Sequence, residues 1–335
     1  QRRPRRGRAP AGRRRPDVTR NAGSPANRAG LTLALCLGAS LLLRLPFVTT
    51  TPMHVDECNF IRALTEGYNL AAYTPHAPGY LYFVLVGRLL LPFSRDPLFA
   101  YALANALGSG IAAYALFRAA ELLFNRRAAF FAAFLAIASP LAWSYGLGAL
   151  SYAAASGPAG LALLETIRAL RGQWRRLPLA VFWLGVLSGF RMMDAVFVSL
   201  PLAWALVATI SPRVPLLDPA ENAPRPGARF ALAAIIPGIA AVLLWVIPVL
   251  ILAGGPARFS ALSSRHQTVF LIFSSGWHYP REVFINLAVF GVSAFLLAGF
   301  LLVPALLGLR QAAVPRPHRA LILLGALPGL LYYLL

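Results

Sequence analysis

Long apolar runs recur along this chain, and they restrict its fold more than any other feature. About 20 apolar residues cross the hydrocarbon core of a bilayer as a helix, which satisfies its own backbone hydrogen bonds. The composition agrees, because 58% of the residues are hydrophobic and only 13% are charged, against about 25% charged residues in a soluble domain. The sequence predicts an all-α integral membrane protein, a polytopic helical bundle, and excludes a soluble fold.

We count about nine transmembrane helices, and one further run, Ala77 to Phe93, is ambiguous. Short segments rich in Arg, Pro, Gly and His separate the runs. The predicted helices cover Ala29 to Phe47, Pro97 to Leu116, Ala128 to Tyr145, Ser151 to Ile167, Leu177 to Gly189, Ala195 to Ile210, Phe230 to Ala253, Val283 to Leu309 and Ala320 to Leu335.

The distribution of arginine predicts the topology, because short cytoplasmic loops are enriched in Arg and Lys. If Ala77 to Phe93 lies flat on the outer surface, the large arginine clusters all fall inside. If it crosses instead, three of those clusters face outward. Arg88 would also cost roughly 2.5–3.5 kcal/mol at mid-membrane. We therefore predict that this segment is interfacial, and that the N-terminus is cytoplasmic in a plasma (inner) membrane.

This topology divides the chain into a tail and one membrane domain. Residues 1–28 hold ten arginines and little apolar surface, which predicts a disordered cytoplasmic tail. Residues 29–335 form the predicted membrane domain, with a first outer loop at 48–96 and a later outer loop at 254–282. The chain stops inside an apolar run, which leaves a C-terminal truncation open. The net charge of +20 is assigned to topology and to contact with membrane lipids, and no nucleic-acid partner is predicted.

The first outer loop carries the most informative residues. Glu57 to Leu70 places Phe60, Ile61 and Leu64 at helical spacing, which predicts an amphipathic helix lying in the interface. With Ala77 to Phe93, this makes two interfacial helices in the loop.

Asp56 and Glu57 are adjacent carboxylates where the first interfacial helix is predicted to begin. Neighbouring residues on a helix do not share a face, so the two carboxylates should serve different partners. One would take a proton from an acceptor while the other fixes the loop. The alternative is a structural helix start, in which Asp56 is the N-cap and Glu57 is solvated.

The order of motifs resembles a known family. His54-Val55-Asp56-Glu57 precedes Tyr68 and Tyr73, and His76-Ala77-Pro78-Gly79-Tyr80-Leu81-Tyr82 follows. This order is similar to the first periplasmic loop of polyprenyl-phosphate-sugar-dependent glycosyltransferases of the GT-C fold, which include protein O-mannosyltransferases and lipid A aminoarabinose transferases. The resemblance covers about Leu31 to Ile210. It implies an inverting enzyme that moves a sugar from a polyprenyl-phosphate carrier to a glycan, lipid or protein acceptor on the non-cytoplasmic side.

The resemblance also implies roles for individual residues. Asp56 would be the general base, Glu57 would orient the loop or bind the acceptor, and Arg191 would pair with the donor phosphate. For Arg191 and Asp194, an i,i+3 ion pair that fixes a hairpin stays open. No cofactor is required, and a divalent metal is left open because no close ligand spacing links the histidines. The remaining expected substrate-binding residues are His54, Tyr68, His76, Tyr80, Tyr82, Arg95, Asp194, Arg265 and His266.

Two other function classes stay open at this point. A polytopic transporter or lipid scramblase would use the same residues to line a substrate path, and would show internal repeats or helices broken near mid-membrane. No clear repeat is visible, and the polar residues gather in the outer loops. A catalytically inactive assembly subunit is the third reading.

Overall fold

The computed structural model describes residues 25–217, 224–264, 292, 315–322 and 324. Within these residues the regular elements are helices, apart from an isolated bridge between Asn69 and Thr74. Four helices are long and apolar enough to cross a membrane: Asn27–Phe47, Pro97–Leu123, Met192–Ile210 and Ala228–Ala253. The prediction of a helical membrane protein is confirmed at this level. Three predicted spans within the described residues, Ala128 to Tyr145, Ser151 to Ile167 and Leu177 to Gly189, do not correspond to any of these four helices. Most of the last two predicted spans lies outside the described residues. The count of about nine spans therefore stays a prediction.

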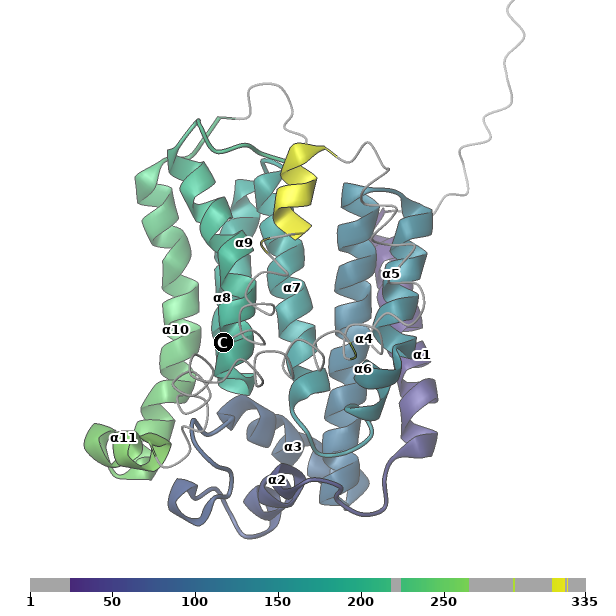
Figure 1. Ribbon diagram of the computed structural model, residues 1–335, viewed down its shortest axis with the longest axis vertical. Coiled ribbons are helices and arrows are strands. Elements are labelled where there is room, and N and C mark those ends of the chain that lie inside the picture. The colour runs from purple at the N-terminus through teal and green to yellow at the C-terminus, as the bar shows by residue number, and fades with distance from the viewer. Residues whose placement is uncertain (1–24, 218–223, 265–291, 293–314, 323, 325–335) are drawn as a thin grey trace, which may run out of the picture.

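Seven helices of the described part of the chain run side by side (Figure 1). The central helix is α4, which buries most of its side chains, whereas α1 and α10 expose much of their apolar surface. The seven helices are α1 (Pro25–Arg44), α4 (Pro97–Leu123), α5 (Arg126–Ala138), α7 (Tyr152–Leu170), α8 (Leu177–Phe190), α9 (Met192–Ile210) and α10 (Ala228–Ala253).

Small residues bring the helix backbones together, as is usual in membrane bundles. A Cβ added at Gly108 of α4 would lie 2.5 Å from the Cα of Ala154 in α7. A Cβ added at Gly185 of α8 would lie 2.6 Å from the carbonyl oxygen of Gly238 in α10. Any larger side chain at these positions would therefore push the helix pairs apart.

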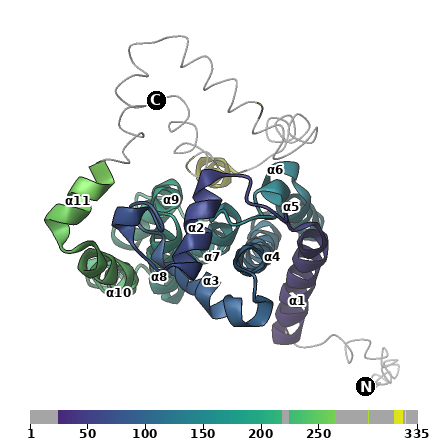
Figure 2. The same ribbon diagram turned by 90° about the horizontal axis from the view of Figure 1, so that it is seen from below.

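Two short helices lie across one end of the bundle, α2 (Val55–Thr65) and α3 (Leu81–Ser94). Figure 2 shows α2 lengthwise in a view along the axes of α4 and α7. The Arg88 guanidinium on α3 donates to the Ala63 carbonyl on α2 at 3.2 Å. The Tyr101 hydroxyl on α4 donates to the Phe60 carbonyl at 3.1 Å. The ambiguous run therefore lies at the end of the bundle, and the side of the membrane on which that end lies stays a prediction.

Several predicted boundaries change for local reasons. The predicted helix from Ala128 to Tyr145 is divided into α5 and α6 (Pro140–Ser144), because Pro140 has no N–H to continue α5. The first interfacial helix ends at Thr65 rather than Leu70, close to Gly67 with its φ of +107°. The other elements are the short 3₁₀ helices η1 (Leu45–Phe47), η2 (Leu70–Ala72) and η3 (Trp174–Arg176), and the helix α11 (Pro256–Ser264). This last helix falls at the start of the segment 254–282, which was predicted to be the later outer loop.

Arg44, at the end of α1, is fully buried and holds α1 against α5 and α6. Its guanidinium donates to the Ser40 hydroxyl and to the Ile137 carbonyl, each at 3.1 Å, and to the Ala142 carbonyl at 3.5 Å. Ile137 lies in the last turn of α5, where the carbonyl groups lack helical partners and favour a cation. The carbonyl groups at the C-terminus of α5 therefore compensate the buried positive charge of Arg44.

Candidate active site

Asp56 lies in the first turn of α2, between two histidines. His76 Nδ1 is 3.5 Å from Asp56 Oδ1, and His54 Nδ1 is 3.6 Å from Asp56 Oδ2. The Asp56 side chain is 34% exposed, so a substrate group can reach it. His54 Nδ1 also accepts a hydrogen bond from the Asp56 backbone N–H at 3.1 Å. A nitrogen that accepts this bond carries no proton and does not donate to the carboxylate.

The structural alternative for the two carboxylates is wrong in both parts. The N-cap of α2 is His54, not Asp56. Glu57 is only 4% exposed and is not solvated. The reason is that Glu57 stands three positions after the cap and turns back, so its Oε2 accepts from the Met53 N–H at 2.7 Å. In a capping box, a carboxylate at this position accepts from the N–H of the N-cap residue. Here Glu57 accepts instead from the N–H of Met53, the residue before the cap.

Glu57 holds two loops together. Its carboxylate packs against Gly148, where an added Cβ would collide with Glu57 Oε1. Beside it, the Thr49 N–H donates to the Leu147 carbonyl at 3.2 Å. Glu57 thus joins the segment before α2 to the loop before α7. The two roles expected for it, orienting the loop or binding the acceptor, stay predictions.

Arg191 lies at the bend between α8 and α9 and reaches the start of α7. Its Nε donates to Asp194 Oδ1 at 3.2 Å, which is the expected i,i+3 ion pair. Its Nη1 donates to the Ser151 hydroxyl at 3.3 Å. The guanidinium carbon is 3.7 Å from the ring centroid of Tyr152, a close cation–π contact. Arg191 thus makes more contacts than the hairpin ion pair alone.

Tyr80 lies between the Asp56 side and the Arg191 side. Its ring centroid is 5.0 Å from that of His76 and 6.0 Å from the Arg191 guanidinium carbon. Burial raises the pKa of Tyr80 to about 12; the charge of Arg191 opposes this rise, and the charge of Asp56 adds to it. Tyr80 therefore contacts His76 on one side, which lies beside Asp56, and faces Arg191 on the other. We call this set the Asp56–Arg191 cluster: His54, Asp56, His76, Tyr80, Ser151, Tyr152, Arg191 and Asp194.

Three of the expected site residues that the structure describes lie apart from the hydrogen bonds and ion pairs of this cluster. Tyr68 and Tyr82 use their hydroxyls on backbone carbonyls, of Gly79 at 2.9 Å and of Ala241 at 2.6 Å. Burial also raises the pKa of Tyr68. Arg95 is exposed at the C-cap of α3, about 22 Å along that helix from Tyr80, and its expected role in substrate binding stays a prediction. Arg265 and His266 lie outside the described residues.

Sequence reasoning missed the residues that begin α7. Asn105, fully buried in α4, donates to the Gly148 and Leu150 carbonyls and accepts from the Ala154 N–H, each at 2.8 Å. These bonds shape the turn that presents Ser151 and Tyr152 to Arg191. Two sequence features could have pointed to these residues. Asn105 is a lone Asn within an apolar run, and Ser151 begins a predicted span at the same end of the bundle as Asp56.

Comparisons with protein-family models, with curated proteins and with solved structures give no match. In the part of the chain that the structure describes, no three His, Cys, Asp or Glu side chains form a group that could hold a metal ion. Assignment of a function therefore rests on the chemistry of the Asp56–Arg191 cluster and on its place at the end of a membrane bundle.

Proposed function

We propose that this chain is a membrane glycosyltransferase of the GT-C type, and that the Asp56–Arg191 cluster is its site. The observation that carries the proposal is a row of contacts that runs from a carboxylate to an arginine. His76 lies 3.5 Å from Asp56 Oδ1, its ring centroid is 5.0 Å from that of Tyr80, and the Tyr80 ring centroid is 6.0 Å from the Arg191 guanidinium carbon. Asp56 comes from the start of α2, and Arg191 from the bend between α8 and α9. An acid and a fixed cation at one end of a bundle suit the transfer of a sugar from a lipid phosphate.

The donor would bind through its phosphate. A polyprenyl-phosphate sugar keeps its tail in the bilayer and its phosphate at the interface, and the predicted topology puts the bend between α8 and α9 at the same level. A guanidinium has five N–H donors. In the described residues, Arg191 donates two hydrogen bonds to protein oxygens, one to Asp194 and one to Ser151. The remaining donors would bind phosphate oxygens. Asp194 would hold the guanidinium in position.

Asp56 would act as the general base. The acceptor hydroxyl would donate a hydrogen bond to the Asp56 carboxylate and pass its proton there as its oxygen bonds to the anomeric carbon. The bond from that carbon to the phosphate oxygen breaks, and its electron pair leaves with the lipid phosphate. Arg191 would stabilise the charge that develops on this leaving group. Attack opposite the leaving group inverts the anomeric centre.

A transfer assay tests the proposal. Purified protein is incubated with a panel of radiolabelled polyprenyl-phosphate sugars and membrane extract, and transfer to glycan, lipid and protein fractions is measured. We expect transfer from at least one donor, lost in Asp56→Asn. The matched control is Asp96→Asn, because Asp96 is the N-cap of α4 in the same loop, outside the cluster, and Asn caps as well as Asp.

Absence of transfer from every donor would contradict the proposal. In that case the protein is reconstituted in vesicles, and movement of a fluorescent lipid phosphate between leaflets is measured. Movement without transfer would favour the transporter or scramblase reading.

A further inference from the structure

A groove of about 560 Å³ lies between α1, α4 and α5, and its Arg28 end lies at the opposite end of the bundle from the Asp56–Arg191 cluster. The groove follows α1 from Arg28 to Leu43, a distance of about 22 Å at 1.5 Å per residue. Half of a hydrocarbon core is about 15 Å thick. The groove is therefore long enough to hold an acyl chain from the interface to the middle of a bilayer.

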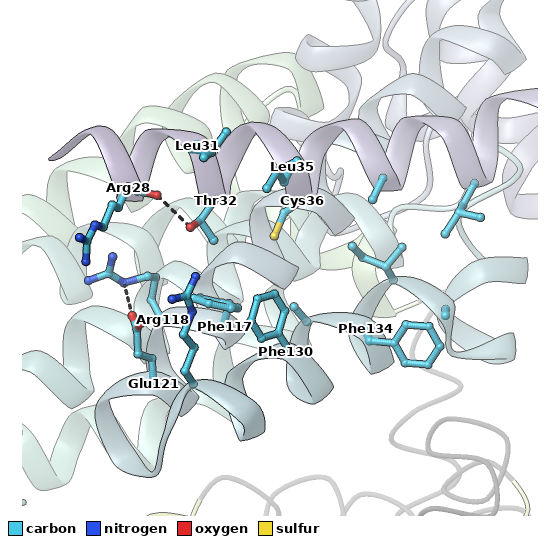
Figure 3. A pocket seen from close by; sticks show the side chains of 16 residues that line it. Arg28, Leu31, Thr32, Leu35, Cys36, Phe117, Arg118, Glu121, Phe130 and Phe134 are labelled. Carbon is cyan, nitrogen blue, oxygen red and sulfur yellow. Dashed lines mark hydrogen bonds and ion pairs between the residues drawn. The ribbon is translucent and has the colours of Figure 1, made fainter. Parts of the chain in front are cut away.

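One end of the groove is cationic. Arg28 of α1, Arg118 of α4 and Arg126 of α5 line it together with a single acid, Glu121. Figure 3 shows Arg28, Arg118 and Glu121 gathered at this end. Arg118 Nε is 3.4 Å from Glu121 Oε2, so one arginine is neutralised and a surplus of two positive charges remains. This surplus is complementary to a phosphate diester.

The first turn of α5 lies at the same end. Asn125 is the N-cap of α5, and its side chain accepts from the Ala128 N–H at 3.0 Å. The other N–H groups of a first turn lack helical partners and favour an anion. The helix terminus therefore adds to the attraction of the three arginines.

The rest of the groove is apolar and open to the bilayer. Figure 3 shows Leu35, Phe130 and Phe134 along this part. Their exposed fractions are 63%, 58% and 61%, although they lie on helices of a membrane bundle. Aromatic and aliphatic side chains that are exposed in this setting face lipid.

We propose that this groove holds a membrane phospholipid with an anionic headgroup, its phosphate against Arg28 and Arg126 and one acyl chain between α1 and α5. The charged end and the apolar end lie in the order that an anionic lipid requires. A free anion would leave the apolar part empty, and a second copy of this chain would bring its own arginines to the same end. By the predicted topology this is the cytoplasmic leaflet.

Native mass spectrometry of the full chain tests this proposal. The protein is released from nanodiscs that contain equal amounts of phosphatidylglycerol and phosphatidylcholine, and the lipid that stays bound is measured. We expect preferential retention of phosphatidylglycerol. Arg28→Gln with Arg126→Gln should weaken this retention by about fivefold per arginine. Glu121→Gln removes the single acid and should strengthen it.

Arg127→Gln is the matched control. Arg127 is the neighbour of Arg126 on the same turn and is exposed, but it does not line the groove, so its loss should change retention little. Should the double variant fail to fold, Glu121→Gln still decides, since no gain in retention would overturn the proposal. Equal retention of both lipids by the unmodified protein would overturn it as well.

Two further results would overturn the choice of occupant. Inorganic phosphate that abolishes the preference at millimolar concentration would indicate an anion site without a lipid. A dimer that carries no lipid and dissociates on Leu35→Glu would indicate that a second copy covers the groove. Sugar transfer by the Asp56–Arg191 cluster is measured separately, so failure of either proposal leaves the other intact.

Discussion

The guanidinium carbon of Arg191 lies 3.7 Å from the ring centroid of Tyr152, and Arg191 Nη1 donates to the neighbouring Ser151 hydroxyl. These contacts join the bend between α8 and α9 to the first turn of α7, about 40 residues earlier in the chain. Tyr80, at the start of α3, faces the same guanidinium. One arginine therefore ties together three segments around the proposed donor phosphate.

Asp56→Asn separates catalysis from stability. Because His54 rather than Asp56 caps α2, the variant should fold and insert with a nearly unchanged melting temperature. Turnover should fall by about 10²–10⁴-fold, the usual contribution of a positioned base. Sugar transfer and thermal unfolding of the purified protein measure the two effects. Near-normal transfer by the folded variant would contradict the mechanism.

Arg191→Gln should weaken donor binding. Loss of a charge-assisted hydrogen bond costs about 1.5–3 kcal/mol, which corresponds to roughly a 10- to 100-fold higher Kd for the lipid-phosphate donor. The variant is made with Asp194→Asn, so that no carboxylate is left unpaired. Arg62→Gln is the control, because Arg62 is an exposed arginine at the same end, paired with Glu66. An unchanged Kd in the double variant would reduce Arg191 to a structural role.

Glu57→Ala should lower stability, because it leaves the Met53 N–H without its acceptor and opens the contact with Gly148. Loss of a hydrogen bond to a charged group costs about 1.5–3 kcal/mol. Gly148→Ala should lower stability for the complementary reason, since the added Cβ collides with the Glu57 carboxylate. Chemical or thermal unfolding measures both changes. A stable Glu57→Ala protein without turnover would instead assign Glu57 to the reaction.

Tyr80 should titrate well above an ordinary tyrosine. Its pKa is raised to about 12, so the folded protein favours the neutral phenol. The stability that this provides is complete below pH 10 and is lost as the pH rises through 12. To measure this pKa, phenolate absorbance is recorded as a function of pH for the unmodified protein and for Tyr80→Phe, and the difference between the two curves is taken as the titration of Tyr80. A difference that titrates near pH 10 would show that Tyr80 is not buried beside the cluster.

Cysteine labelling at the two ends of the bundle tests the predicted membrane topology. Cys58 on α2 is exposed and Cys36 on α1 is buried, so a membrane-impermeant maleimide should label Cys58 in intact cells. With Cys58→Ser, a cysteine placed at Arg127 should be labelled only after the membrane is permeabilised. Labelling of that cysteine in intact cells would reverse the predicted orientation.

The amino-acid sequence alone determined the class of the protein and the segments that bear its polar chemistry. Apolar runs predicted the helices, and the start of α4 at Pro97 and of α8 at Leu177 agree with them. Arginine counting predicted that Ala77 to Phe93 lies flat on the outer surface, and the position of α3 across one end of the bundle agrees with a segment that does not cross. These inferences succeed because hydropathy and charge act residue by residue on the cost of entering a membrane.

Only the tertiary structure decided which residues meet. It turned Glu57 inward, made His54 the helix cap, added Ser151 and Tyr152 to the cluster and left Arg95 at the far end of α3. Local spacing predicts which residues share a helix face, but contacts between residues about 40 to 111 positions apart depend on how the helices pack. That packing follows from small residues such as Gly108 and Gly185, whose lack of a side chain lets backbones approach, and no charge or hydropathy pattern reports which helix lies opposite.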